Sequence, residues 1–295
     1  MKYSSGIPVV LGSLLLTGCV TTSSAPSPSI PSGEETAPPA QVRRTGEATS
    51  WKITPTDQPQ TYTSHLTTVI TQTDIPASRR DSLVTQTSYS IATTRSADTA
   101  VFSGSIESFV VQGNTVDSAS VRLSTPIAFT GAFGNHQITA KLSSDNRVEE
   151  PGSCENLAQT PLKIIQRNLF LLPLQLTAGQ AWTDSTSSHV CNGTLQTINT
   201  VIRTLRVAGE SELNGNFVLA LDENERTFSK GEGSQGQHQI LIETQGSTTG
   251  RLYVDRNSGQ LLTAQTTNRT SVSIASSGRI QHFIQNSTEL IQKTR

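Results

Sequence analysis

The stretch Ala264–Ile274, with the sequence AQTTNRTSVSI, decides the fold class because polar and apolar side chains alternate along it. A period of two puts successive side chains on opposite faces of a β-strand and is typical of a strand with one face in water. Near the start of the β-rich region, Tyr62, Leu66 and Ile70 also share one parity. Turn motifs that accept positive φ at low cost separate such stretches: Gly113-Asn114, Gly134-Asn135, Asn192-Gly193, Asn214-Gly215 and Asn257-Ser258-Gly259. We therefore predict a mainly β chain built as a meander of antiparallel hairpins.

One segment departs from this alternation. Thr160 and Pro161 form a good N-cap and first-turn pair, and apolar residues then recur at helical spacing up to Pro173. These residues are Leu162, Ile165, Leu169 and Leu172. They predict one amphipathic helix over 161–172 whose apolar face the sheet covers. The helix would join two β halves, 61–150 and 174–292, of a β-rich domain that spans 60–295.

The composition limits the classes of partner. The chain has 295 residues, of which only 15% are charged, with 22 basic against 23 acidic side chains. A chain with nearly equal numbers of positive and negative charges has no net positive electrostatic potential to attract a polyanion. We therefore expect no nucleic acid partner.

The first residues have the pattern of a signal peptide. Lys2 supplies a positive charge, and an apolar stretch follows from Ile7 to Leu16. Ten residues rise only about 15 Å as a helix, half the thickness of a bilayer core, so the stretch is too short to span a membrane. We predict a signal peptide over residues 1–18.

The end of this segment, Leu16-Thr17-Gly18-Cys19, resembles the lipobox of bacterial lipoproteins. The resemblance implies that Cys19 becomes the first residue of the mature chain and carries fatty acyl chains such as palmitate. In Gram-negative bacteria the next residue influences sorting, and Val20 is not the aspartate associated with retention in the inner membrane. The resemblance therefore implies an anchor in the outer membrane, with the protein facing the periplasm. The alternative is an ordinary secretory signal with an incidental cysteine.

Residues 19–59 are rich in Ser, Thr and Pro and show almost no apolar periodicity. Such a segment buries too little surface to offset its ordering entropy. We predict a disordered tether between the lipid anchor and the folded domain.

The mature chain would keep two cysteines, Cys154 and Cys191. In an oxidising compartment the pair predicts a disulfide, worth about 4 kcal/mol on the chain-entropy model. Two free buried thiols are the alternative. No cysteine–histidine spacing indicates a metal site.

Catalytic motifs fail in their context. Gly231–Gly236 matches the glycine spacing of a dinucleotide site, but alternating residues follow it where a helix is needed. Ser144-Asp145-Asn146 lacks the other elements of penicillin-binding enzymes. The histidines are isolated in polar stretches, at positions 65, 136, 189, 238 and 282. We predict no enzymatic activity and no cofactor.

A second resemblance concerns the β region. Residues 250–261, with Leu172-Pro173-Leu174 and the run 178–182, resemble β-rich, half-barrel bacterial lipoproteins and, more distantly, lipoprotein-localisation carriers of the LolA and LolB type. The resemblance implies a curved antiparallel sheet, or half-barrel, that wraps a helix and leaves an apolar concavity. The residues that would line it are Leu162, Ile165, Leu169, Leu172, Phe129 and Phe133.

Two functions follow from these patterns. In the first, the concave face binds a lipid, a lipoprotein or another envelope component. In the second, the core is filled, and protein partners dock on sheet edges or on the surface. In both, the lipid anchor makes the membrane a partner.

Overall fold

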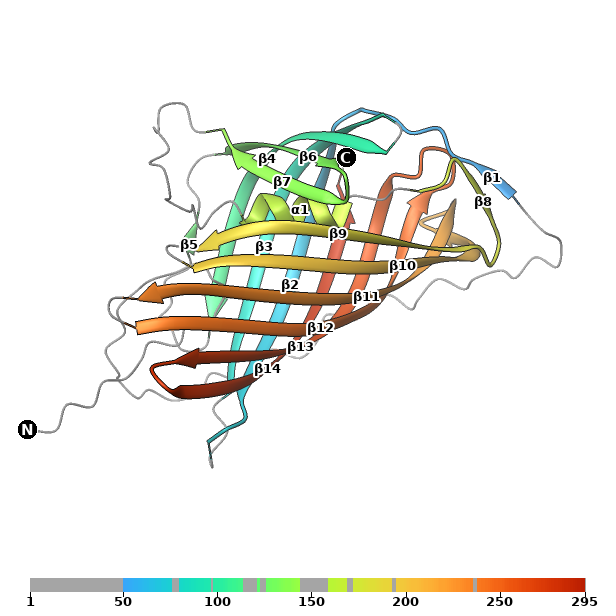
Figure 1. Ribbon diagram of the computed structural model, residues 1–295. Coiled ribbons are helices and arrows are strands. Elements are labelled where there is room, and N and C mark those ends of the chain that lie inside the picture. The colour runs from blue at the N-terminus through green and yellow to red at the C-terminus, as the bar shows by residue number, and fades with distance from the viewer. Residues whose placement is uncertain are drawn as a thin grey trace, which may run out of the picture.

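The computed structural model describes residues 50–75, 80–96, 98–113, 121–122, 126–143, 159–168, 172–192, 195–235 and 238–294 (Figure 1). Nearly all of them lie in β-strands, with one helix among the described residues. The elements are β1 (Ser50–Lys52), β2 (Gln60–Gln72), β3 (Arg80–Ser96), β4 (Thr99–Gly113), β5 (Val121–Arg122), β6 (Ile127–Gly134), β7 (Gln137–Leu142), α1 (Gln159–Asn168), β8 (Gln175–Thr177), β9 (Ala181–Asn192), β10 (Leu195–Leu213), β11 (Asn216–Gln235), β12 (His238–Asp255), β13 (Leu261–Ser276) and β14 (Arg279–Lys293).

The strands form a closed barrel of 11 strands. The order is β3-β2-β14-β13-β12-β11-β10-β9-β7-β6-β4, and β4 pairs back with β3 to close the ring; β5 pairs only with β4. The predicted meander of hairpins is confirmed, but the predicted half-barrel is wrong. The β3–β4 pairing leaves no long free edge there, and the pairings that join strands distant in the sequence are β2–β14 and β7–β9.

The two predicted β halves belong to this one barrel. Strands β2 to β7 come from the first half and strands β9 to β14 from the second. At Asn214-Gly215, between β10 and β11, both residues have positive φ, at 52° and 79°. This two-residue turn confirms the hairpin predicted there.

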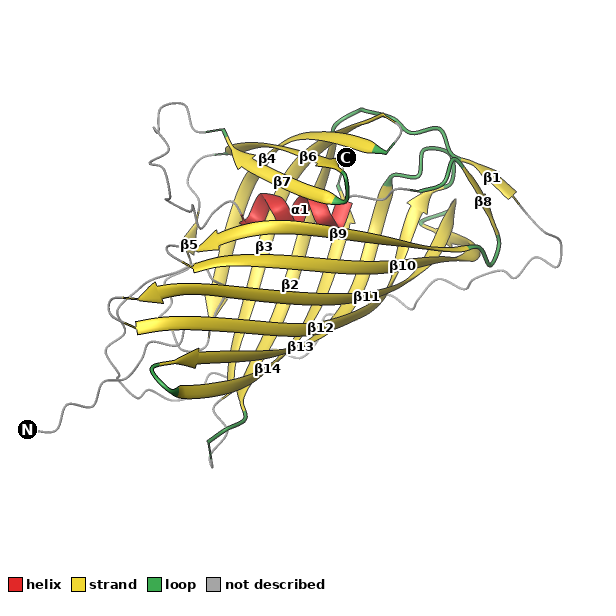
Figure 2. Ribbon diagram, in the orientation of Figure 1, coloured by secondary structure: helices red, strands yellow, loops and turns green. Residues whose placement is uncertain are grey.

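The predicted helix forms, but it is shorter than the range 161–172. Helix α1 ends at Asn168, whose side-chain amide donates to the carbonyl of Ile164. Leu169 lies outside the described residues, and Leu172 follows the helix. The helix packs against β6 and β7, and Figure 2 shows it within the ring of strands.

The predicted tether over 19–59 extends too far along the chain. Residues 50–59 belong to the fold, because β1 pairs with β8 and the apolar Trp51 and Ile53 are buried. The Trp51 indole donates to Glu210 Oε1 over 2.9 Å. These two apolar side chains provide the burial that places this segment in the fold.

The barrel wall has an apolar inner face and a polar outer face. Along β13 the buried residues Ala264, Thr266 and Val272 alternate with exposed polar residues, namely Gln265, Thr267, Arg269 and Ser271. One large core cluster surrounds α1, and a smaller one, with Ile70, Ile242 and Phe283, lies toward the other end of the strands. Among the described residues no helix is long and apolar enough to cross a membrane.

Candidate functional site in the barrel interior

The residues predicted to line an apolar concavity lie in the packed core. Leu162, Ile165, Phe129 and Phe133 are buried in one cluster, and Ile165 has no exposed surface. The helix approaches β6 so closely that a Cβ at Gly131 would collide with Ile165. Leu172 belongs to the same cluster, and Leu169 lies outside the described residues. Their role in ligand binding stays a prediction.

A small cavity lies beside this core. It has a volume of about 90 Å³ and its lining includes Tyr62, Arg95, Asn168 and Leu172. Pockets that bind small molecules usually have volumes of roughly 300 Å³ or more. This cavity is therefore too small to hold an acyl chain.

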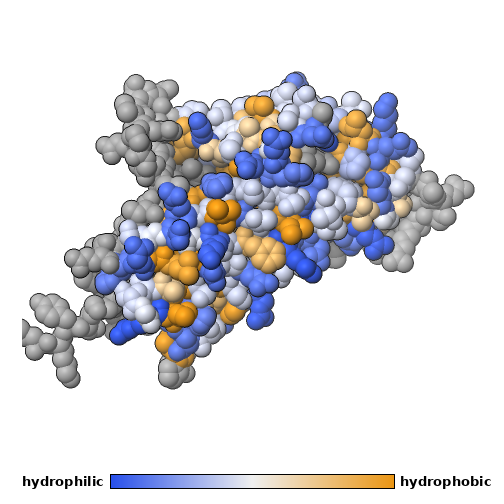
Figure 3. Space-filling model, viewed as in Figure 1, coloured by the Kyte–Doolittle hydropathy of each residue, from blue (hydrophilic) through white to orange (hydrophobic). Residues whose placement is uncertain are grey.

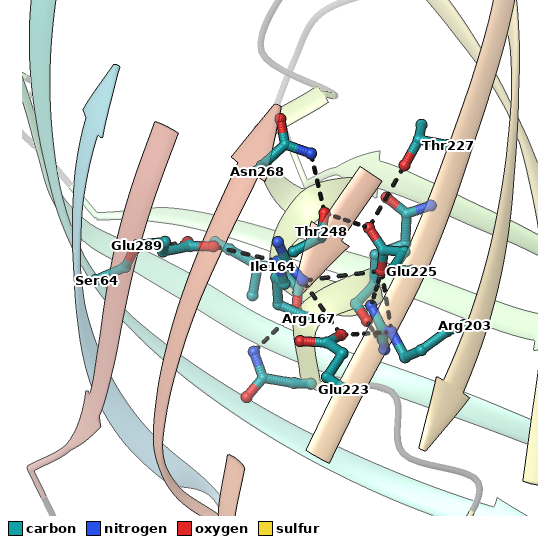
Figure 4. A network of polar contacts seen from close by, with 12 residues as sticks. Ser64, Ile164, Arg167, Arg203, Glu223, Glu225, Thr227, Thr248, Asn268 and Glu289 are labelled. Atoms are coloured by element: carbon teal, nitrogen blue, oxygen red, sulfur yellow. Dashed lines mark hydrogen bonds and ion pairs between the residues drawn. The ribbon is translucent and has the colours of Figure 1, made fainter. Parts of the chain in front are cut away.

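A network of charged side chains joins the helix to the far wall (Figure 4). Arg203 of β10 contacts Glu223 and Glu225 of β11, with 2.9 Å between Nε and Glu223 Oε1 and 2.9 Å between Nη2 and Glu225 Oε2. The ladder places Arg203 directly opposite Glu225. Glu223 lies two residues away on the same face of β11, so one guanidinium reaches both carboxylates.

The helix contributes the second cation. Arg167 lies in the last turn of α1, and its Nη1 is 3.4 Å from Glu223 Oε1 and 3.8 Å from Glu225 Oε2. Its Nε is 3.1 Å from Glu289 Oε2 on β14. The network therefore holds α1 to β11 and β14, whereas the apolar side of the helix packs against β6 and β7.

Neutral groups complete the network. Thr248 donates to Glu225 Oε1 over 3.4 Å, and Asn268 donates to Thr248 over 2.9 Å. Ser64 donates to Glu289 over 2.9 Å, and Arg203 also donates to the carbonyl of Gln166. Glu223 Oε2 is buried and has no hydrogen-bond partner among the described residues.

The electrostatics favour the charged forms. Burial would raise the pKa of Glu225, but Arg167, Arg203 and hydrogen bonds outweigh it and hold the pKa below its ordinary value. Burial would lower the pKa of Arg167, but Glu289, Glu225 and Glu223 raise it instead. A carboxylate held ionised by two guanidinium groups is a poor proton acceptor, so the arrangement suits fixing the helix better than proton transfer.

This network was not predicted from the sequence, although the sequence carries a signal for it. Glu223 and Glu225 share the parity of the apolar Leu219 and Leu221. Charged residues at core-facing positions of a strand indicate a buried ion pair, because an unpaired buried charge is too costly.

The remaining motifs and cysteines singled out in the sequence lie partly inside and partly outside the described residues. All five histidines are exposed, as predicted for solvated side chains. Gly231 and Gly233 lie within β11, and the strand β12, not a helix, follows from His238, so the context of a dinucleotide site is absent there. Cys19 and Cys154 lie outside the described residues, as does Ser144-Asp145-Asn146, and Cys191 lies in β9. Lipidation and the disulfide stay predictions.

Comparisons with known proteins give limited guidance. No family model and no curated protein matches the sequence. Among solved structures, the chain is similar to Pseudomonas aeruginosa OccK2 (OpdF), with 6% identity, a TM-score of 0.28 and coverage of 83% of this chain and 99% of that chain. It is also similar to the beta domain of the Bordetella autotransporter BrkA, with 7% identity, a TM-score of 0.24 and coverage of 80% and 99%. Similarity this low carries no argument about function.

Proposed function

We propose that the protein is a non-enzymatic envelope lipoprotein whose barrel faces water and binds its partners on its outer surface. The observation that carries this proposal is the burial of the apolar side of α1. Leu162 and Ile165, which would line the predicted concavity, are buried in the core beside β6 and β7. Two functions were inferred from the sequence. Burial of these side chains in the core favours the second, in which partners dock on the surface.

The outer face of the wall supports a water-facing barrel. Barrels that span a membrane carry an outward apolar band about 25 Å tall. Here the outward positions of β13 include Gln265, Thr267, Arg269 and Ser271, and on β14 the polar His282, Asn286, Thr288 and Gln292 interrupt the apolar Ile280, Ile284 and Leu290, so neither strand carries a continuous apolar band. Such polar side chains would be costly in hydrocarbon.

The lipobox provides the anchor in this proposal. Acyl chains on Cys19 would hold the protein at the membrane, and residues 19–49 would link the anchor to Ser50, where the described fold begins. Val20 favours the outer membrane and a periplasmic orientation. A lipid-carrier function has less support, because apolar side chains that would line its concavity are buried in the core.

Membrane fractionation tests the anchor. We expect Cys19→Ser to remove acyl labelling and, once the signal peptide is removed, to release the protein from membranes in a high-salt wash. A variant that keeps acyl labelling would contradict the lipobox assignment.

Lipid extraction tests the filled core. The Cys19→Ser chain keeps the signal peptide and every described residue, and we expect the released protein to purify without stoichiometric lipid. Added fatty acid should leave its denaturation midpoint unchanged. Release of one lipid per chain in native mass spectrometry would instead establish the carrier function.

A further inference from the structure

An apolar cluster interrupts the polar outer wall on two neighbouring strands. Ile198 and Ile202 of β10 are 51% and 37% exposed, and Phe228 of β11 is 39% exposed. Phe228 pairs with Thr200, which lies midway between the two isoleucines. Figure 3 shows apolar atoms over β10 and β11 among hydrophilic neighbours.

Basic side chains adjoin this cluster. The ladder places Ile202 opposite Arg226, Arg226 opposite Ser247, and Ser247 opposite Arg269, in one row across β10 to β13. Ile198 lies opposite Lys230. We call these six residues the wall patch: Ile198, Ile202, Phe228, Arg226, Lys230 and Arg269.

The wall patch and its immediate neighbours carry more positive than negative charge. Two acidic side chains adjoin Lys230: Glu243, which lies opposite it at 3.5 Å from the lysine amine, and the exposed Glu232, two residues along β11, whereas Arg226 and Arg269 lie opposite uncharged residues. The Lys230 and Glu243 side chains are both more than half exposed, so their attraction is weak. Exposed apolar groups surrounded by cations match the interfacial region of an anionic lipid surface.

The tether enters the fold beside the same strand. Trp51, next to the first described residue, donates to Glu210 of β10. Gly179 and Gln180, which follow β8, exchange backbone hydrogen bonds with Val207 of β10. Ile202 is eight residues from Glu210 along this strand, about 26 Å away at 3.3 Å per residue. The chain that leads to the anchor therefore enters toward the other end of β10, and the roughly 30 residues between Cys19 and Ser50 are long enough to bring the anchor to the wall patch.

A second exposed apolar site provides a contrast. Phe217 of β11 is 48% exposed, but it lies opposite Glu212. Its cationic neighbour Arg256 is 3.7 Å from Glu210. This site has apolar surface without a cationic excess, so it does not match an anionic surface.

We propose that the wall patch rests on the anionic headgroups of the bilayer that holds the lipid anchor, so that the barrel lies on its side against the membrane. This inference rests on the proposed function, because the anchor brings the membrane within reach.

Vesicle binding without the anchor tests the inference. The chain from Val20 onward is mixed with vesicles of phosphatidylcholine alone or with one quarter phosphatidylglycerol, and bound protein is measured by sedimentation. We expect binding to the anionic vesicles that falls at least tenfold between 50 and 500 mM salt, because salt screens such contacts. Equal binding to both vesicles, or none, would overturn the proposal.

Variants separate the two components of the wall patch. We expect Ile198→Ser with Phe228→Ser to lower binding about tenfold, and Arg226→Gln with Arg269→Gln to remove the preference for anionic vesicles. Phe217→Ser is the matched control and should bind as the unmodified chain does. An effect of Phe217→Ser equal to that of Phe228→Ser would contradict the assignment.

These outcomes are distinct from a failure of the proposed function. Acyl labelling and fractionation of Cys19→Ser test the anchor with the wall patch intact. Vesicle binding tests the wall patch with the anchor absent.

Discussion

The two seams where the first-half strands meet the second-half strands differ sharply. At one seam β2 and β14 pair along a continuous ladder from Gln72 and Phe283 to Tyr62 and Lys293. At the other seam, among the described residues, β7 and β9 share one parallel pair, Gln137 with Ser187. There Ser187 also donates to the carbonyl of His136 over 2.7 Å.

The weak seam has a helix behind it. Helix α1 packs against β6 and β7, beside this seam, and Arg167 links it to β11 and β14 across the interior. Side-chain packing and ion pairs thus hold β7 to the rest of the barrel where backbone hydrogen bonds are few. The first-half strands are thus joined to the second-half strands by a backbone ladder at one seam and by a packed helix at the other. Variants can compare how much each contributes to the free energy of unfolding.

The largest effect is expected from the charge network. Arg203→Met leaves Glu223 and Glu225 buried with one cation fewer, and removing one partner of a buried ion pair costs about 3–5 kcal/mol. Urea unfolding of the chain from Val20 onward measures the loss. Lys230→Met, which breaks an exposed pair, is the control and should change the free energy of unfolding by less than about 1 kcal/mol. Equal losses would show that the network does not brace the barrel.

The apolar side of the helix should rank next. Ile165 has no exposed surface, so Ile165→Ala should cost about 2–5 kcal/mol through lost burial and the cavity left behind. The exposed Ile198→Ala is the control and should cost much less. A loss below about 1 kcal/mol for Ile165→Ala would mean that α1 contributes little to holding β6 and β7.

Acid should weaken the brace before it affects the ladder. The pKa of Glu225 in the folded chain lies below its ordinary value of 4.5. Its stabilising contribution is therefore present above pH 4.5 and is lost as the pH falls through the folded value. Urea midpoints between pH 7 and pH 3 should decline below about pH 4.5, and less steeply in Glu225→Gln. Equal slopes in both proteins would exclude Glu225 as the titrating group.

The smallest effect is expected at the weak seam itself. His136 Nδ1 is 3.1 Å from the carbonyl of Ser185 and lies in an exposed position. His136→Ala should lower the free energy of unfolding by less than about 1 kcal/mol. Hydrogen exchange at the Ser187 amide should nevertheless accelerate. Thr67→Ala, on the β2–β14 seam, is the control, and its neighbouring amides should keep their protection. Acceleration at both seams alike would remove the contrast between them.

The sequence predicted the parts of the fold that depend on nearby residues. Alternation gave the strands, Asn214-Gly215 gave a hairpin, and the spacing of Leu162 and Ile165 gave the helix. The closure of the barrel was not predicted. The β2–β14 ladder joins residues as distant in the sequence as Thr68 and Ser287, and neither strand carries a local pattern that identifies the strand with which it pairs. The network was missed for the same reason, since Arg167 meets carboxylates from two distant strands.

The β2–β14 ladder also determines the order in which the barrel can assemble. Strands β9 to β14 pair with their neighbours in sequence, so each hairpin can form soon after its second strand is available. The β2–β14 ladder must bring together segments more than 200 residues apart, and contacts of such long range make folding slow. We expect the meander of β9 to β14 to form first and to stay open until β2 docks. Only this late step would enclose α1 and its ion pairs, so the chain would pass through a stage with a formed sheet and an accessible interior.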